Sequence, residues 1–377
     1  MDFGFSEEQE MLRTMARDFL AKECPSTYVR EMMEDERGFT DAFWSKMAEL
    51  GWMGLILPEE HGGSGLGLVD LVVVLEEMGR AVVPGPFFST MVGTMALLEG
   101  ASDALKAEVL PRIATGDLKI TLAHLEPSGR LDPGGITATA TKSDGGYRLD
   151  GTKLFVPDAG TADLIIVVAR EPGSTGSDGV GLFLADREAS GVAITPLKTM
   201  DQTRKLAEVK LDGVQVAGGR LVGSVGGGWA LLDRIVDRAK VGLCAEMCGG
   251  AEKVLEMSVE YAKVREQFGR PIGSFQAIQH KCANMLVEVE SSKSVTYYAA
   301  WAAATDIEEA PLAAAMAKAY CSEAYRHTAG EGIQIHGGIG FTWEHDMHLY
   351  FKRAKSSEVT FGDATWNREL VAQRIDL

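Results

Sequence analysis

The spacing of apolar residues changes twice along this chain of 377 residues, and these two changes constrain the fold more than any single motif does. The chain begins with apolar residues at the three- and four-residue spacing of amphipathic helices. From Lys119 short β-rich segments alternate with turn residues, and helical spacing returns after Gly226-Gly227-Gly228. We therefore predict a helical domain at 1–118, a β domain at 119–222 and a second helical domain at 223–377.

The first segment carries clear helix signals. Ser6 and Gln9 have the spacing of a capping box, so a helix is predicted to begin near Glu7. Further helices are predicted from near Asp41, at 68–80, at 89–99 and at 103–115. The glycine-rich stretch 51–65 is interpreted as a connection between two of these helices.

The middle segment alternates short strands with turns. Strands are predicted at 137–141, 147–149, 164–168, 181–184 and 207–211. Asp150-Gly151 and Asp212-Gly213 are predicted as turns, because Asp-Gly pairs favour tight hairpins. Since no helical pattern lies between the strands, we expect an antiparallel barrel or sandwich.

The third segment predicts a bundle of long helices. Alanine-rich amphipathic stretches indicate helices at 229–263, 275–304 and 311–330, with a last helix at 365–374. The fold class is therefore α+β, with a β domain between two helical domains.

Charge and cysteine usage limit the possible partners. The chain has 37 Lys and Arg against 54 Asp and Glu, and its net charge of −17 argues against nucleic acid or an anionic membrane as a partner. Its five cysteines show no CxxC pair, which favours free thiols in a reducing cytoplasm. No apolar run has the length of a membrane span, and the N-terminus has no secretory pattern, so we expect a cytoplasmic protein.

The stretch from Gln334 to Phe341 contains three glycines in four positions. Glycine lacks a Cβ, so the backbone here can approach a flat or polyanionic ligand closely. The alternative interpretation is a helix C-cap, since glycines often end alanine-rich helices. Both interpretations stay open on the residues alone.

The chain resembles the acyl-CoA dehydrogenase family over essentially its whole length. The motifs that carry the resemblance are Gly51-Trp52 through Gly65, Leu125-Glu126-Pro127, Val264-Arg265-Glu266-Gln267-Phe268-Gly269, Phe275-Gln276-Ala277-Ile278-Gln279 and Gln334 through Phe341. The resemblance implies an N-terminal helical domain, a central β domain and a C-terminal four-helix bundle. It also implies FAD as cofactor and oxidation of acyl-CoA thioesters to trans-2-enoyl-CoA, in lipid or steroid catabolism.

The resemblance assigns the cofactor site to two groups of residues. From a neighbouring subunit, Arg265 would bind the FAD diphosphate and Phe268 would pack beside the adenosine. The remaining residues implied to contact the cofactor are Gln276, Gln334, Gly337 and Gly338, together with Leu125, Glu126, Phe155, Val156 and Pro157 of the β domain. Asp237 and Lys240 fall where the family contacts the acyl-CoA. The alternative for Arg265 is a surface ion pair with Glu260 or Glu266.

The chain departs from the family where the chemistry takes place. The family's catalytic Glu, which removes the α-proton of the substrate, is replaced by Phe361, and the other position used by relatives is Ala239. Asp363 and Asp237 are the available carboxylates, and Asp363 has a competing role as a helix N-cap. Pro157 also stands where relatives place Ser or Thr against the flavin, so that hydroxyl is missing.

Three interpretations follow from these departures. The chain is an active dehydrogenase with a relocated base, a non-catalytic partner that shares FAD sites with a second acyl-CoA dehydrogenase subunit, or a member repurposed for other flavin or CoA chemistry. The second arrangement resembles family members that act on CoA thioesters of steroid side chains. The resemblance implies a homo-oligomer or hetero-oligomer and an electron-transfer flavoprotein, or a similar protein, as acceptor. No metal site is expected from His345 and His348.

Overall fold

The computed structural model describes residues 4–377, which form two compact units. The first unit contains the chain up to Glu31, Leu68–Val83 and Asp237–Leu377. The second contains Met32–Gly67 and Pro84–Val236. Helices from both ends of the sequence thus meet in the first unit, and the division into three consecutive domains stays a prediction.

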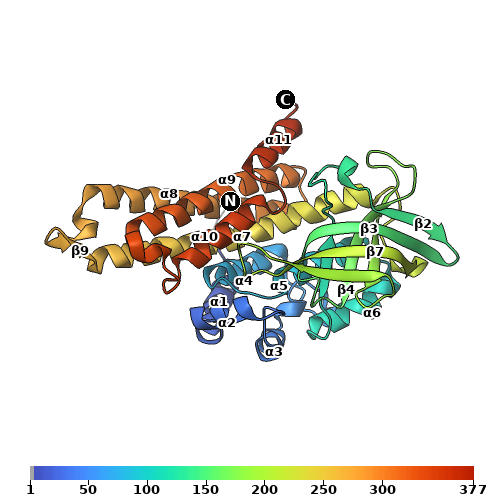
Figure 1. The fold of residues 1–377 in the computed structure, drawn as a ribbon, viewed down its shortest axis with the longest axis horizontal. Coiled ribbons are helices and arrows are strands. Elements are labelled where there is room, and N and C mark those ends of the chain that lie inside the picture. Colours follow the sequence, from blue (N-terminus) through green and yellow to red (C-terminus); the bar gives the residue numbers. More distant parts are fainter. Residues whose placement is uncertain (1–3) are drawn as a thin grey trace. The chain divides into compact units, whose positions relative to one another are not determined.

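The first unit is helical, and α8 and α9 run side by side in it (Figure 1). Its helices are α1 (Glu7–Glu23), α2 (Ser26–Glu34), α4 (Leu68–Arg80), α7 (Gly228–Val264), α8 (Gln276–Ala304), α9 (Ala310–His336), α10 (Met347–Val359) and α11 (Ala364–Arg374), of which α2 and α7 also reach into the second unit. The predicted capping box is confirmed: the Ser6 hydroxyl accepts from the Gln9 N–H at 3.2 Å, and the Ser6 N–H donates to the Gln9 amide oxygen at 3.0 Å.

Two glycines let α4 and α7 approach with their backbones almost touching. A Cβ added to Gly79 would lie 2.0 Å from the Glu246 carbonyl oxygen, and one added to Gly249 would lie 1.8 Å from the Glu76 carbonyl oxygen. These distances leave no room for a side chain. The packing of α4 into the bundle therefore requires glycine at both positions.

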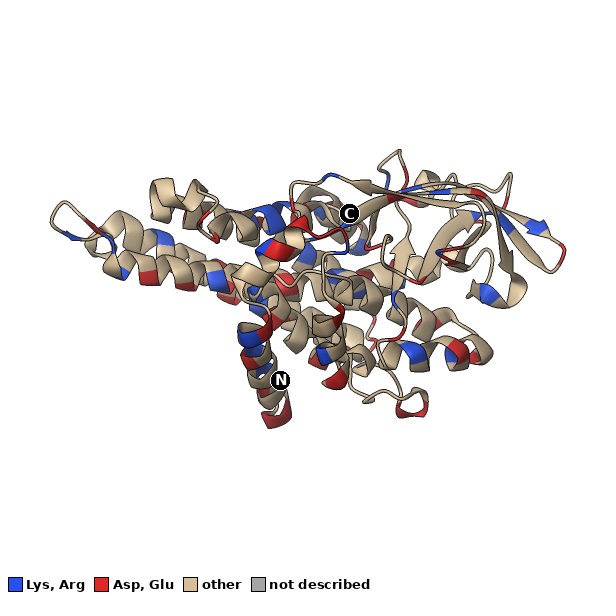
Figure 2. Ribbon diagram, turned by 60° about the horizontal axis from the view of Figure 1, so that its bottom comes forward, with Lys and Arg blue, Asp and Glu red and all other residues tan. Residues whose placement is uncertain are grey.

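Charged residues of both signs line the helices, as the blue and red segments in Figure 2 show. Buried Glu76 of α4 accepts a hydrogen bond from the Tyr297 hydroxyl at 2.5 Å. Neighbouring Glu77 accepts two hydrogen bonds from the Arg17 guanidinium at 2.6 and 2.9 Å. Each buried carboxylate therefore has a donor, as burial of charge demands.

The second unit combines helices with a sheet of eight strands. Its helices are α3 (Asp41–Glu49), α5 (Phe87–Gly100) and α6 (Asp103–Ala114), and its strands are β1 (Ile120–Ala123), β2 (Thr139–Ser143), β3 (Gly146–Pro157), β4 (Leu164–Arg170), β5 (Val180–Asp186), β6 (Val192–Leu197), β7 (Leu206–Ala217) and β8 (Leu221–Val222). The strand order is β6-β7-β3-β2-β4-β5-β8, with β1 beside β4. The central β domain is confirmed, but the sheet is mixed, because β1 and β2 both pair with β4 in parallel.

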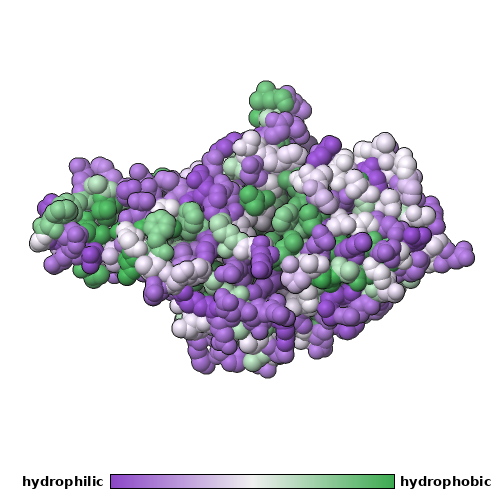
Figure 3. Space-filling view, in the orientation of Figure 1, coloured by the Kyte–Doolittle hydropathy of each residue, from purple (hydrophilic) through white to green (hydrophobic). Residues whose placement is uncertain are grey.

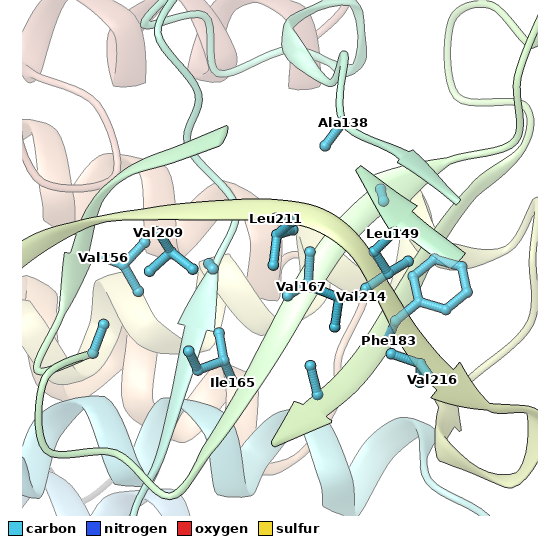
Figure 4. Packing of buried hydrophobic residues seen from close by; sticks show 14 of the residues in the cluster. Ala138, Leu149, Val156, Ile165, Val167, Phe183, Val209, Leu211, Val214 and Val216 are labelled. Atoms are coloured by element: carbon cyan, nitrogen blue, oxygen red, sulfur yellow. The ribbon is translucent and has the colours of Figure 1, made fainter. Parts of the chain in front are cut away.

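Side chains from most of the strands fill the core of this sheet (Figure 4). Leu149 of β3, Ile165 and Val167 of β4, Phe183 of β5 and Val209 of β7 are all buried. In β3 and β7 buried residues alternate with less buried ones, so a shift by one residue would bring Leu149 and Val209 out of the core, and their burial fixes the register of these strands. The core thus anchors the long strand β3, which ends in the predicted flavin segment.

The structure corrects several predictions of local structure. Gly151 and Gly213 lie inside β3 and β7, not in turns; Gly151, with φ of 146°, follows a register shift in the pairing of these strands. Both Asp-Gly pairs therefore lie within long strands and not at hairpin turns. The elements α2, α10, β1 and β6 were not predicted. Helix α9 continues to His336, so Gln334 lies in its last turn, and Gly337 is its C-cap with φ of 63°.

The glycine contact between α4 and α7 predicts the effect of one methyl group. We expect Gly249→Ala to lower the free energy of unfolding by about 1–3 kcal/mol or more, because the new Cβ overlaps the Glu76 carbonyl. Gly330→Ala in α9 is the matched control: its Cβ meets no atom within 4 Å, and alanine favours a helix by about 1 kcal/mol. Chemical denaturation of both variants measures the difference, and equal stabilities would contradict the close contact.

Candidate functional site

Two segments that the sequence assigns to the flavin lie side by side in the second unit. The Leu154 N–H donates to the Leu125 carbonyl at 2.9 Å, which joins the end of β3 to the segment 125–127. Beside this contact, the Lys153 ammonium lies 2.6 Å from the Glu126 carboxylate, and both side chains are buried. A backbone hydrogen bond and a buried ion pair therefore hold the two segments together.

The Glu126 carboxylate binds several groups of its own chain. Its carboxylate also accepts from the Thr137 N–H at 2.8 Å and the Ala138 N–H at 3.0 Å. Burial alone would raise the pKa of Glu126, but Lys153 and these hydrogen bonds bring its pKa below the usual value. Burial lowers the pKa of Lys153 to about 8. The Glu126 side chain thus organises the segment, and the part that could meet a cofactor is the backbone that it holds.

The second predicted flavin segment presents one of its side chains to solvent. Phe155 has a positive φ of 53° and is 51% exposed, whereas Val156 points into the core. The carbonyl of Pro157 accepts a hydrogen bond from the Thr121 hydroxyl at 2.6 Å. A left-handed phenylalanine is costly and is typical of functional segments. Of the three residues, Phe155 has the side chain most available to a ligand.

In the first unit, a short hairpin between α7 and α8 carries the predicted diphosphate site. Strands β9 (Glu266–Gln267) and β10 (Arg270–Pro271) pair antiparallel. Phe268 at the turn is 93% exposed with φ of 54°. The Arg265 guanidinium is exposed and has no ion pair or side-chain hydrogen bond within residues 4–377, while Glu260 pairs with Lys263. The expected alternative, an ion pair from Arg265 to Glu260 or Glu266, is therefore not formed.

Sequence reasoning missed a second guanidinium on this hairpin. Arg270 lies 4.1 Å from the centre of the Phe275 ring, which also contacts Phe268 edge-on at 6.1 Å. Arg270 directly follows the motif Val264–Gly269 and lies two residues after Phe268, and that position was the available signal. In Figure 3 hydrophobic residues gather at the end of the molecule where Figure 1 labels β9.

At the end of α9 the backbone is exposed and no side chain of the described residues covers it. Gln334, Gly337 and Gly338 are exposed, and a Cβ on either glycine would meet no atom of residues 4–377 within 4 Å. Gln276, the first residue of α8, is exposed as well. An unpaired guanidinium, exposed aromatic rings, amides and uncovered glycine backbone have the donor chemistry that a dinucleotide requires. The residues present therefore fit FAD.

A cluster of aromatic and imidazole rings surrounds His336, the residue directly before Gly337. The His336 ring stacks on Tyr261 at 4.4 Å, contacts the His345 ring at 4.5 Å and places Nδ1 2.7 Å from the Gly332 carbonyl. Burial lowers the pKa of His336; the hydrogen bond with the Gly332 carbonyl raises it by less, and the charge of His345 makes a smaller contribution in the same direction as burial. Burial also lowers the pKa values of His345 and His348.

The two base positions of the family hold no carboxylate. Phe361 is 9% exposed with φ of 59°, and Ala239 on α7 is fully buried. The loop around Phe361 is tightly held: the buried Lys318 ammonium donates to the carbonyls of Glu358 at 3.0 Å and Gly362 at 2.9 Å. The loop has a defined shape without a proton acceptor at its centre.

The two alternative carboxylates have structural partners. The exposed Asp363 accepts from the Trp366 N–H at 2.8 Å and so caps α11. Buried Asp237 lies 3.0 Å from the Lys240 ammonium and 2.9 Å from the Arg374 guanidinium. Asp237 and Lys240 lie together on α7, one helical turn apart, but each binds the other. These contacts disfavour Asp363 and Asp237 as bases.

Neither a metal centre nor a membrane segment is evident in the described chain. Across residues 4–377 no group of three or more His, Cys, Asp or Glu side chains is arranged to hold a metal ion. His345 accepts from the Met347 N–H at 3.1 Å, and His348 packs on Trp343. Over the same residues no helix is both long enough and apolar enough to cross a membrane.

The buried imidazoles predict a loss of stability in acid. Because the pKa of His336 is lowered in the folded state, the unfolded chain binds the proton first as pH falls below 6.5. One such histidine accounts for at most about 1.4 kcal/mol per pH unit. We expect His336→Phe, which keeps a ring on Tyr261, to flatten the fall in melting temperature between pH 7.5 and pH 5.5. His280→Gln, at an exposed position of α8, is the control; an unchanged slope in His336→Phe would exclude this role.

Comparison with known proteins agrees with this geometry. The sequence matches the acyl-CoA dehydrogenase N-terminal domain over residues 6–117, the middle domain over 121–214 and the C-terminal domain over 226–376. It is similar to the acyl-CoA dehydrogenase IpdE2 of Mycobacterium tuberculosis (strain ATCC 25618 / H37Rv), with 36% identity over 93% of this chain and 92% of that protein.

Two solved structures share the whole fold. The ChsE4-ChsE5 complex from Mycobacterium tuberculosis has 29% identity and a TM-score of 0.91 over 100% of this chain and 99% of that one. The structure of PigA with FAD and proline has 25% identity and a TM-score of 0.92, with the same coverage. From the match of all three domains, this chain belongs to the acyl-CoA dehydrogenase family.

Proposed function

We propose that this chain takes part in the FAD-dependent α,β-desaturation of an acyl-CoA thioester to the 2-enoyl-CoA. Family membership supports the reaction class, and PigA, a relative by structure, is described with FAD. The observation that carries the proposal is the exposed Arg265, which lacks an anionic partner within residues 4–377 in a chain of net charge −17. An anionic ligand accounts for it.

The chain's own residues would bind and orient the cofactor. Arg265 would donate two parallel N–H hydrogen bonds to phosphate oxygens, because the geometry of the guanidinium matches that of a phosphate group. Phe268 would cover the adenosine, and the backbone of Gly337 and Gly338 would come close to the ligand without steric hindrance. When bound, FAD supplies the acceptor for the hydride that leaves the β-carbon.

A second candidate role is that of a non-catalytic subunit. The specific observation is the lack of a carboxylate at Phe361 and Ala239, together with the engagement of Asp237 by Lys240 and Arg374. A second acyl-CoA dehydrogenase chain would then supply the base, while this chain supplies Arg265 and the glycines. The ChsE4-ChsE5 complex, a structural relative, pairs two differently named chains. An electron-transfer flavoprotein would serve as the electron acceptor.

One assay separates these roles. The chain is purified alone and with each acyl-CoA dehydrogenase chain encoded near it, and FAD content and acyl-CoA desaturation are measured for each sample. Turnover by the chain alone supports a relocated base in this chain. Turnover only with a companion supports the subunit role. FAD or CoA binding without desaturation in any sample overturns the proposed reaction and leaves another flavin or CoA chemistry.

Removal of the unpaired guanidinium tests the cofactor site. We expect Arg265→Ala to reduce FAD affinity by about tenfold or more, because a charge-assisted hydrogen bond contributes about 1.5–3 kcal/mol. Arg368→Ala, which breaks the exposed ion pair with Glu323, is the control for general loss of positive charge. Titration of the apoprotein with FAD measures both. Equal FAD affinity in Arg265→Ala and wild type would remove the main support for the site.

Restoring the carboxylate tests the base position. We expect Phe361→Glu to raise desaturation by the FAD-loaded protein by about 100-fold or more, the contribution of a positioned general base. Phe361→Gln has a similar shape without a proton acceptor and should show no gain. Stopped-flow bleaching of the flavin by acyl-CoA measures the step. An FAD-loaded Phe361→Glu protein as slow as Phe361→Gln would show that the loop does not present residue 361 to the substrate.

A further inference from the structure

The glycine segment at the end of α9 is a short 3₁₀ helix that packs on α9 through buried Gly340 and is exposed elsewhere. We call residues 337–341 the glycine ribbon. A Cβ on Gly337 or Gly338 would have no neighbour within 4 Å, and the side chains of Ile339 and Phe341 are 46% and 70% exposed. The outer face of the ribbon therefore has little packing of its own. Its position depends on what holds the residues before and after it.

The upstream end is fixed by α9 and by the ring cluster. His336 is buried, its Nδ1 lies 2.7 Å from the Gly332 carbonyl, and its ring stacks on Tyr261 of α7. These contacts hold the last turn of the helix.

At the downstream end, the Trp343 ring packs on His348 and Lys352, and His345 Nδ1 accepts from the Met347 N–H. The contact that ties this turn to another part of the sequence is a guanidinium from α2. The side chain of Arg30 is 28% exposed, and it donates to the carbonyls of Trp343 and His345, the latter at 3.1 Å. It also donates twice to the Asp346 carboxylate, at 2.8 and 3.2 Å. One side chain thus binds acceptor groups of three residues, Trp343, His345 and Asp346, in the turn that leads from the ribbon into α10.

We infer that Arg30 is a positioning residue for the glycine ribbon, and that it sets the geometry of the ribbon for the cofactor. The effect on the cofactor rests on the proposed function; the anchoring of the turn does not. Arg30 fixes the turn at residues 343–346, and the contact between the rings of His345 and His336 links that turn to the upstream anchor. The ribbon is then a short span between two fixed points.

Arginine is suited to this role for a geometric reason. Two carbonyl oxygens and a carboxylate lie around one planar fork, and the five N–H donors of a guanidinium can serve all three at once. A lysine ammonium on a flexible stem serves them less well. The variant Arg30→Lys should therefore keep the charge and lose part of the anchoring, which separates geometry from electrostatics.

Hydrogen exchange of the full chain tests the anchor without relying on FAD. We expect Arg30→Ala to speed amide exchange in residues 337–346 by tenfold or more, with Arg30→Lys intermediate and with α4 and α8 unchanged. Arg368→Ala, whose guanidinium pairs with Glu323 between α11 and α9, is the matched control and should leave 337–346 at the wild-type rate. Unchanged exchange in Arg30→Ala, or faster exchange throughout the first unit, would overturn the positioning role.

Titration of the same apoproteins with FAD tests the consequence for the cofactor. We expect FAD affinity to fall about tenfold in Arg30→Ala and less in Arg30→Lys, in step with the exchange rates. Wild-type affinity in an Arg30→Ala protein whose ribbon exchanges faster would overturn the link from anchor to cofactor. Failure of the wild-type protein itself to bind FAD would instead refute the proposed function, while the exchange result would still decide whether Arg30 anchors the turn.

Discussion

The buried ion pair between Lys153 and Glu126 is the interaction on which the β half of the site depends. Removing either charge would leave the other in a low-dielectric interior, at a cost of several kcal/mol. Lys153 is thereby tied to Glu126, and Glu126 in turn binds the amides of Thr137 and Ala138. The segment 125–127 and the end of β3 consequently behave as one rigid surface. Lys318 has the same role in the first unit, where it holds the loop that carries Phe361.

Much of the fold could be predicted because local patterns and tertiary structure agree. The capping box of Ser6 and Gln9 and the helix Leu68–Arg80 depend only on neighbouring residues, and both were located from the sequence. The turn predicted at Asp150-Gly151 was wrong for the opposite reason. Strand β3 continues through this pair because β7 pairs with β3 along most of its length, and that pairing is not visible in the local sequence.

The candidate site could likewise be predicted from the sequence only in part. Motif residues such as Arg265 and Phe268 could be named from the sequence, because resemblance identifies positions. Their surroundings could not be predicted. Arg30 is more than 300 residues from the turn that it binds, and Asp237 meets Arg374 across the bundle. Such contacts follow from helix packing alone, so sequence spacing gave no sign of them.

The loop at Phe361 is well supported although the side chain at its centre is apolar. Its backbone keeps a positive φ at Phe361, and both Lys318 and Asn367 donate hydrogen bonds to its carbonyls. A strained, well-supported loop is a feature of catalytic segments. Its presence around an apolar side chain is consistent with a site whose chemistry is completed elsewhere.

The open space beside Gly338 affects how this protein should be assayed. A Cβ at Gly338 would meet no atom of residues 4–377 within 4 Å, so a library screened for expression or thermal tolerance would score small substitutions at Gly338 as silent. Any selection against them must come from a second molecule that occupies that space. A mutational scan read out by folding alone would therefore overlook this part of the surface, whereas a scan performed with FAD present would test whether a ligand occupies it.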